Sequence, residues 1–152
     1  MLPFSDLLDL PSMTICTSTP QGVPHAASVY FVADDRLSLY FLSAASSQHV
    51  QDVALNPLAA VTIEPLVDRW QEIRGLQMRG TIAEIPNGFQ SVAGWARYLA
   101  KFPYVKNFEI EVLKNRFYAF KPGWVRLVDN RLRFGYKQEW SGDELLRLCT
   151  SG

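Results

Sequence analysis

The side chains best suited to chemistry gather in a serine-rich turn that is followed by an amide and an imidazole. Ser43 and Ser47 supply hydroxyl groups, while Gln48 and His49 add an amide and a ring that titrates near neutral pH. Ser46 or Ser47 is a suitable N-cap for a short helix, so the amide and the imidazole fall in its first turn. Because a helix N-terminus presents unpaired N–H groups and partial positive charge, the pattern is typical of a phosphate site. An ordinary capped surface helix fits the same residues.

The elements on either side of this turn would hold it in place. Alternating apolar residues over 37–42 predict a half-buried strand that leads into the turn. Apolar residues over 50–54 have helical spacing, and Pro57 stops the helix after about two turns because proline lacks an N–H group. The apolar run 58–63 predicts the next strand. The order is therefore strand, polar turn, short helix and strand.

Composition limits the class of protein. The chain has 152 residues, of which 48% are hydrophobic and 12% aromatic, enough for one packed domain spanning 1–152. Its 15 basic and 15 acidic residues cancel, which argues against a nucleic-acid or anionic-membrane partner. No apolar run approaches the roughly eighteen residues of a membrane span, so we expect a cytoplasmic protein. Cys16 and Cys149 stand far apart, so neither a disulfide framework nor a metal site is expected.

The rest of the chain reads as short strands with a few inserted helices. Apolar spacing predicts a helix between Pro86 and Pro103 with Trp95 and Tyr98 partly off its core stripe, which consists of Phe89, Val92, Ala93, Ala96 and Leu99. Further strands are predicted at 13–18, 25–32, 73–85, 116–120 and 124–128 (a hairpin about 121–123), and 132–140 before a polar end. Gly75 and Gly80 within 73–85 indicate either a bulge or a place where backbone or ligand comes close. Six or more mostly antiparallel strands with flanking helices predict a mainly β fold, a small closed or partly closed barrel.

Three stretches resemble a known family. Residues 20–63, PQGVPHAASVYFVADDRLSLYFLSAASSQHVQDVALNPLAAVTI, resemble the opening of the pyridoxamine 5'-phosphate oxidase-like FMN-binding split β-barrels. Residues 74–84, RGLQMRGTIAE, resemble the family's next barrel strand, and residues 124–137, WVRLVDNRLRFGYK, resemble the closing segment of a branch of small bacterial members. The resemblance covers roughly residues 10–140. It implies an antiparallel split barrel, FMN as cofactor, and a homodimer whose flavin lies at the subunit interface.

The resemblance also implies a set of cofactor-binding residues. They are Ser28, Val29, Leu42, Ser43, Ser47, Gln48, His49, Gly75, Gln77, Lys137 and Trp140. In the family, a Ser-Arg-Lys-like triplet holds the FMN phosphate, whereas this chain has Ser47-Gln48-His49. Two permanent cations are thus replaced by an amide and a partly protonated ring, which predicts weaker and more pH-sensitive phosphate binding.

Three predicted flavin contacts come from elsewhere in the chain. Gly75 stands where some members carry a flavin-contacting glutamine, for which Gln77 is the expected substitute. Lys137 and Trp140 are expected to reach the flavin from the partner subunit.

The leading functional hypothesis is an FMN-dependent oxidoreductase that acts on an unidentified small molecule, with no catalytic residue assigned. The closing segment lacks the basic cluster that a second phosphate would need, so pyridoxamine phosphate oxidase activity itself is not expected. One alternative is a non-enzymatic module for flavin, for another phosphorylated ligand, or for haem with His25 or His49 as the iron ligand. Another is an interaction protein that uses Trp70, Trp95 and Tyr104.

Overall fold

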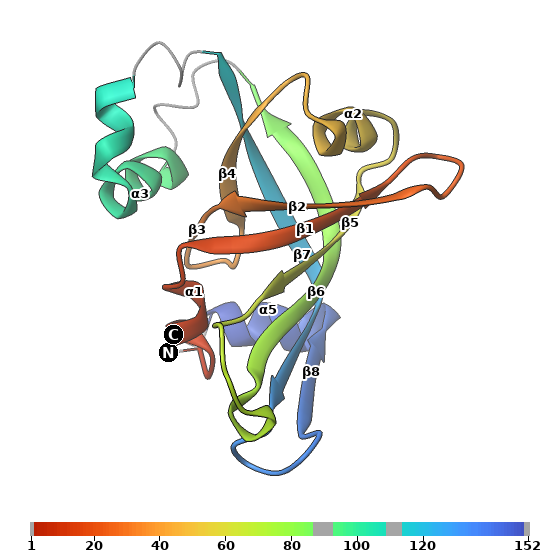
Figure 1. Ribbon diagram of the computed structural model, residues 1–152, viewed down its shortest axis with the longest axis vertical. Helices are drawn as coiled ribbons and strands as arrows, with labels where there is room; N and C mark the ends of the chain where they lie inside the picture. The colour runs from red at the N-terminus through yellow and green to blue at the C-terminus, as the bar shows by residue number, and fades with distance from the viewer. Residues whose placement is uncertain (1, 87–92, 109–113, 151–152) are drawn as a thin grey trace.

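One antiparallel sheet curls into an open barrel in this computed structural model, which describes residues 2–86, 93–108 and 114–150 (Figure 1). The sheet has eight strands in the described residues, in the order β2-β1-β5-β6-β7-β4-β3, and β8 pairs with β7. The strands are β1 (Ser12–Ser18), β2 (Pro24–Tyr30), β3 (Val32–Ala33), β4 (Leu39–Ala44), β5 (Leu58–Ile63), β6 (Arg74–Ile85), β7 (Asn115–Asp129) and β8 (Lys137–Ser141). The predicted mainly β, antiparallel split barrel is confirmed.

Alternation of side chains decides which face of each strand is buried. In β1, Met13, Ile15 and Thr17 are buried while the residues between them are half-buried. In β5, Val61 and Ile63 turn to the same interior. These side chains join a core that fills the barrel, with Phe41, Tyr118 and Phe120 contributed by β4 and β7. Buried and more exposed residues alternate along such a strand because successive side chains point to opposite faces of the sheet.

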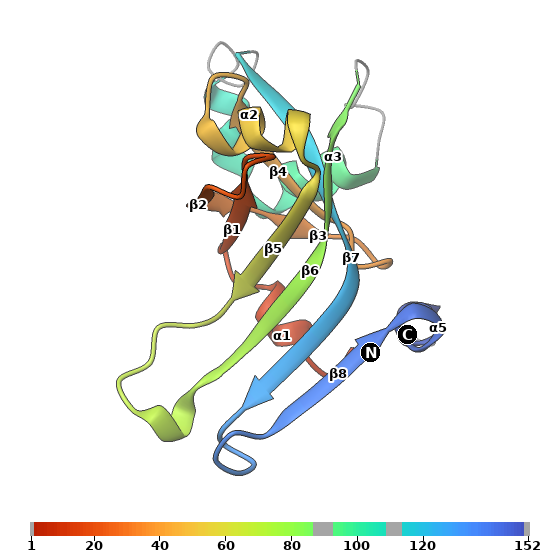
Figure 2. The same cartoon turned by 90° about the vertical axis from the view of Figure 1, so that its right-hand side faces the viewer.

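Helices flank the barrel. They are α1 (Ser5–Leu8), α2 (Gln48–Leu55), α3 (Ala93–Lys101) and α5 (Gly142–Thr150), with 3₁₀ turns at Trp70–Glu72 and Pro103–Phe108. Helix α2 lies at one end of the barrel against β1 and β2, α3 lies by β3 and β4, and α5 lies beside β7 and β8 (Figures 1 and 2). Within the described part of the chain, no helix combines the length and apolar character needed to cross a membrane.

The buried face of α3 differs from the prediction. Trp95 and Tyr98 are buried in a second core with Tyr40, whereas Ala96 is exposed. Gly94 sets this orientation, because a Cβ atom there would lie 2.8 Å from the Tyr40 ring. The aromatic side chains of α3 therefore face the core in place of the smaller residues, and Trp95 is not available as an exposed contact. Phe89 and Val92 of the predicted stripe lie outside the described residues.

The predicted hairpin about residues 121–123 is wrong. Strand β7 runs through this segment without turning, and Pro122 pairs with Gly80 of β6. The register shifts between Arg79 and Gly80, which confirms the predicted bulge at Gly80. A Cβ atom at Gly80 would lie 2.0 Å from the Lys121 carbonyl oxygen, so the two backbones approach too closely for any side chain. A bulge is also where a strand tolerates proline, since the ladder is already interrupted there.

The end of the chain was predicted only in part. Strand β8 covers part of the expected strand over 132–140, and α5 replaces the expected polar end. Within α5 Leu145 is buried, and Leu148 and Cys149 pack partly buried against the barrel core.

Candidate functional site

The barrel is open along a seam between β2 and β4. Among the described residues, β2 pairs only with β1, and β4 beyond Tyr40 pairs only with β7. The two strands contact each other without forming a ladder (Figure 1). Strand edges carry backbone donors and acceptors that a ligand can use. One such group is already engaged, because the buried Tyr98 hydroxyl, whose pKa burial raises to about 12, bonds the backbone of Leu42.

The serine-rich turn and the start of α2 close one end of this seam. Ser47 is the N-cap of α2, as predicted, but its hydroxyl donates to the Ala44 carbonyl oxygen at 2.7 Å instead of capping an N–H group. The N–H groups of Gln48 and His49 have no acceptor among the described residues. Two backbone donors thus remain free at the helix N-terminus, which fits an anion.

Three side chains form a polar cluster at this point. The His49 Nε2 atom lies 2.5 Å from the Ser43 hydroxyl and 3.2 Å from the Ser47 hydroxyl, and the two hydroxyls are 3.1 Å apart. Burial lowers the pKa of His49, against a smaller opposing effect of the Asp52 charge. His49 is therefore mainly neutral at neutral pH, and the cluster holds no fixed positive charge.

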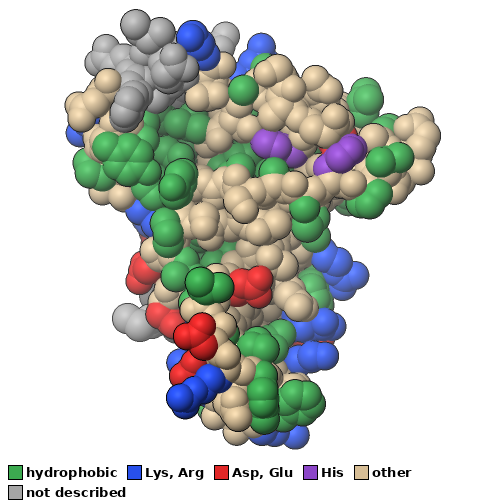
Figure 3. All heavy atoms as spheres, in the orientation of Figure 1, with side chains coloured by type: hydrophobic (Ala, Val, Ile, Leu, Met, Phe, Trp, Pro, Cys, Tyr) green, Lys and Arg blue, Asp and Glu red, His purple; other side chains and the backbone are tan. Residues whose placement is uncertain are grey.

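A second histidine lies beside α2 on a buried carboxylate. His25 of β2 contacts Asp52 through Nδ1 at 2.7 Å, and Asp52 also accepts from the Thr17 hydroxyl at 2.7 Å and the Gln48 amide at 3.0 Å. Although burial raises the pKa of Asp52, the hydrogen bonds from Thr17, Gln48 and His25 together lower it. The His25 side chain is 34% exposed, and its Nε2 atom bonds no described residue. Both histidines lie on one face of the molecule (Figure 3).

This geometry can be compared with known proteins. A family model described as pyridoxamine 5'-phosphate oxidase matches residues 5–129. The chain belongs to this family. A UPF0306 protein of Photorhabdus laumondii is 28% identical over 128 residues, which are 84% of this chain and 85% of that protein.

Two solved structures of the same fold bind different cofactors according to their descriptions. A haem-binding protein from Mycobacterium smegmatis superimposes with a TM-score of 0.73 at 18% identity, over 91% of this chain and 55% of that chain. An FAD-binding protein from Mesorhizobium loti superimposes with a TM-score of 0.62 at 14% identity, over 78% of this chain and 86% of that chain. At these identities the likeness shows the fold and nothing finer.

The predicted cofactor residues of this family member fall into two groups. The first group lies at the seam or the start of α2 and consists of Val29, Leu42, Ser43, Ser47, Gln48 and His49. The second consists of Ser28, Gly75 and Gln77 on the outer face of the sheet and of Lys137 and Trp140 on β8, with the Trp140 ring buried in the core. The structure brings Ser43, Ser47 and His49 into contact within one chain. Val29 of β2 packs against the barrel core, whereas Leu42 of β4 packs against the second core.

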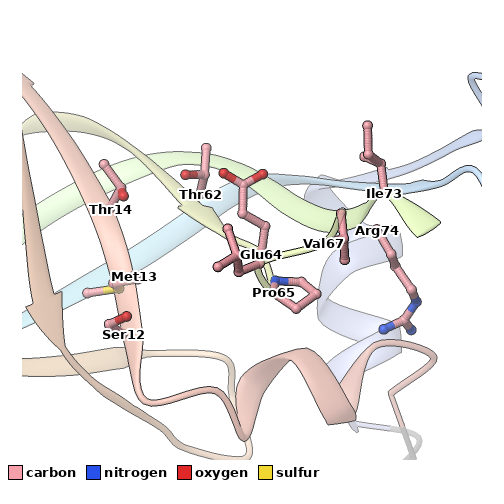
Figure 4. Close-up of a pocket in the computed structure, with 10 residues that line it drawn as sticks. Ser12, Met13, Thr14, Thr62, Glu64, Pro65, Val67, Ile73 and Arg74 are labelled. Atoms are coloured by element: carbon pink, nitrogen blue, oxygen red, sulfur yellow. The ribbon is translucent and has the colours of Figure 1, made fainter. Parts of the chain in front are cut away.

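A polar row crosses the outer face. Strand register aligns Ser28, Thr14, Thr62, Gln77, Arg126 and Glu139 on six successive strands. A cavity of about 430 Å³ opens beside Thr14 and Thr62 under the loop 64–67. In Figure 4 the oxygen atoms of Thr62 and Glu64 lie near each other, and the Arg74 side chain points away from them. Ser28 and Gln77 thus share the outer surface, and of the two only Ser28 lies on a strand that borders the seam.

Three predicted contacts have their own local explanations. A Cβ atom at Gly75 would lie 3.0 Å from the Ile63 carbonyl oxygen and from the Glu64 Cβ atom, so any side chain there would require the neighbouring residues to shift by a few tenths of an ångström. Lys137 is exposed on β8 opposite Val128. Trp140 is 8% exposed and packs on Phe4 in the barrel core.

The buried position of Asp52 was not predicted from the sequence. An acidic residue among the apolar positions of a short helix was the available signal, since a buried carboxylate needs partners. Those partners, Thr17 and His25, come from strands far away in the chain.

Proposed function

We propose that this family member binds FMN in the seam between β2 and β4, with the phosphate at the start of α2. The observation that carries the proposal is the convergence of Ser43, Ser47 and two free backbone N–H groups at the open end of the seam. Hydroxyl and N–H donors at a helix N-terminus are suited to a phosphate group. Unpaired edges of β2 and β4 offer backbone groups to the polar edge of a flavin ring.

An oxidoreductase acting on a small molecule is the activity that we propose for the loaded protein. A bound flavin supplies the hydride chemistry, while the protein binds, orients and shields the reactants. The neutral character of the cluster around His49 predicts modest FMN affinity, because a permanent cation strengthens phosphate binding.

We also propose a homodimer. Gln77 and Lys137 lie on β6 and β8, away from the seam of their own chain. If these residues contact the flavin, as the family resemblance implies, a second copy has to bring them there. Size-exclusion chromatography with light scattering tests this, and a monomer at micromolar concentration contradicts it.

A second candidate function, haem binding, is favoured by His25. Its Nδ1 atom is held by a buried carboxylate and its Nε2 atom bonds no residue that the structure describes, which is how protein side chains commonly orient a metal-ligating histidine. Haemin titration of the wild type and of His25→Ala separates the candidates. A Soret shift that disappears in His25→Ala supports haem, whereas no shift in the wild type removes this candidate.

The flavin proposal is tested by purification and titration. The visible spectrum shows whether flavin is retained, and quenching of flavin fluorescence measures added FMN. We expect saturable binding at micromolar FMN, followed by bleaching of the flavin absorbance when NADH, NADPH or a metabolite donor is supplied. Absence of binding contradicts the proposed cofactor, and binding without any reduction favours a flavin carrier over an enzyme.

A further inference from the structure

The proposed phosphate site lacks a fixed positive charge within its own turn. Ser43, Ser47 and Gln48 are neutral, and burial lowers the pKa of His49. A phosphate monoester carries about −1.5 to −2 charges at neutral pH, so its binding is strong only where a cation takes part. The sheet places such a cation next to the turn.

Arg116 of β7 stands directly opposite Ser43 of β4 in the antiparallel register. Side chains of opposite residues share a face, with their Cβ atoms about 4.5–5.5 Å apart. Ser43 contacts His49, and the next pair on this face is Phe41 with Tyr118, whose rings stack at 5.5 Å. Arg116 is therefore a permanent cation on the same rim of the barrel as the Ser43 hydroxyl.

The present partner of Arg116 holds it weakly. Its Nη1 atom lies 3.2 Å from both carboxylate oxygens of Glu84, and the two side chains are 57% and 43% exposed. An exposed ion pair of this kind contributes about 0–1 kcal/mol. The Nε and Nη2 atoms of Arg116 bond no described residue. A phosphate can thus replace Glu84 as the partner of the guanidinium with only a small loss of free energy.

We propose that Arg116 binds the terminal phosphate of the flavin and supplies the positive charge that Gln48 and His49 lack. This inference rests on the proposed FMN site and deepens it, because it makes Arg116 the residue that distinguishes FMN from riboflavin. Glu84 then competes with the phosphate for the same guanidinium.

Fluorescence titrations of the full-length protein with FMN and with riboflavin test the inference. Arg116→Gln is expected to raise the FMN Kd roughly tenfold or more, as for loss of a hydrogen bond to a charged group, and to leave the riboflavin Kd unchanged. Arg116→Lys keeps the positive charge, and its FMN Kd is expected to lie between those of the wild type and Arg116→Gln. Glu84→Gln removes the competitor and is expected to lower the FMN Kd.

Arg97→Gln is the matched control, since Arg97 also forms an exposed ion pair, with Asp35, but on α3. It is expected to change neither Kd. Circular dichroism checks that each variant is folded. An FMN preference that survives in Arg116→Gln overturns the inference while the flavin site stands. Equal wild-type affinity for FMN and riboflavin also overturns it, and a wild type that binds neither flavin overturns the proposed function as well.

Discussion

The Nε2 atom of His49 lies 2.5 Å from the hydroxyl of Ser43, so the imidazole itself occupies the polar end of the seam. A phosphate that reaches this serine has to share it with the ring or to displace the ring. Either way, the protonation state of His49 enters the binding free energy of a phosphorylated ligand.

FMN affinity is expected to depend on pH through His49. Burial lowers the pKa of the free ring, and a bound phosphate favours the protonated ring, so the pKa of His49 is higher in the complex. Binding then takes up a proton, and FMN affinity rises as pH falls toward about 6, by at most about tenfold per pH unit. Below about pH 6 the phosphate itself takes up a proton, so FMN affinity stops increasing. Flavin titrations at several pH values measure this.

The control for the pH effect is riboflavin, which has no phosphate and is expected to show no such trend. His49→Gln should flatten the FMN curve while keeping a polar side chain. A slope that persists in His49→Gln would assign the titrating group to another residue.

Replacement of Gln48 and His49 together by alanine is expected to reduce FMN affinity with little loss of stability. The two side chains lie at the helix start, and Asp52 keeps its bonds to Thr17 and His25 when Gln48 is removed. Thermal unfolding and FMN titration measure the two effects separately. Gln51→Ala, which removes an exposed side chain from the same helix, is the control and should leave affinity unchanged. Wild-type affinity in the double variant would show that the phosphate lies elsewhere.

The approach of β6 to β7 predicts a sharp difference between two glycines. Gly80→Ala forces a Cβ atom to 2.0 Å from the Lys121 carbonyl oxygen, whereas a Cβ atom at Gly123 meets nothing within 4 Å. Because backbone has to move, Gly80→Ala is expected to destabilise the protein by about 1–3 kcal/mol or more. Gly123→Ala should be neutral or slightly stabilising. Urea unfolding of both variants measures the difference, and equal midpoints would contradict the bulge geometry.

A buried guanidinium ties the N-terminal helix to the barrel. Arg74, 7% exposed, donates to Asp129 at 2.9 Å and to the Pro3 carbonyl oxygen at 3.1 Å, and it also pairs with Asp6 of α1. Arg74→Met is expected to lower the free energy of unfolding by about 3 kcal/mol, because it leaves a buried carboxylate short of a partner. Arg131 bonds the same carboxylate but is 55% exposed, so Arg131→Met should cost about 1 kcal/mol or less.

The effect of Arg74 has a predictable pH dependence. Hydrogen bonds from Arg131 first, and also from Arg74, lower the pKa of Asp129 in the folded protein. A carboxylate with a lowered folded-state pKa stabilises the protein above its unfolded-state pKa, and this contribution is lost as pH falls through the folded-state value. The difference between wild type and Arg74→Met should therefore shrink below about pH 4 in denaturant unfolding. A constant difference down to acidic pH would contradict the ion-pair interpretation.

Local signals explain which parts of the fold could be read from the sequence. The serine-rich turn and the helix stop before Pro57 are encoded within a few residues and were predicted correctly, and Ser47 is one of the two serines predicted as the N-cap. The segment 121–123 carries the same kind of local turn signal, yet its conformation is decided by pairing with Gly80, some forty residues earlier. Non-local pairing therefore overrode turn chemistry.

In the candidate site, too, local features could be predicted from the sequence and non-local contacts could not. Residues of the turn and helix start could be proposed from type and spacing. Arg116 and Asp52 could not be proposed in this way. The role of Arg116 depends on its cross-strand pairing with Ser43, and that of Asp52 on its burial beside Thr17 and His25. Neither the strand pairing nor the burial can be predicted from a local sequence pattern.

The most direct test of the central claim is a crystal structure of the protein soaked with FMN. We expect the phosphate within hydrogen-bond distance of the hydroxyls of Ser43 and Ser47 and the backbone N–H groups of Gln48 and His49, with the ring along the seam between β2 and β4. Flavin density on the outer face away from α2, or no flavin density at saturating FMN, would contradict the claim.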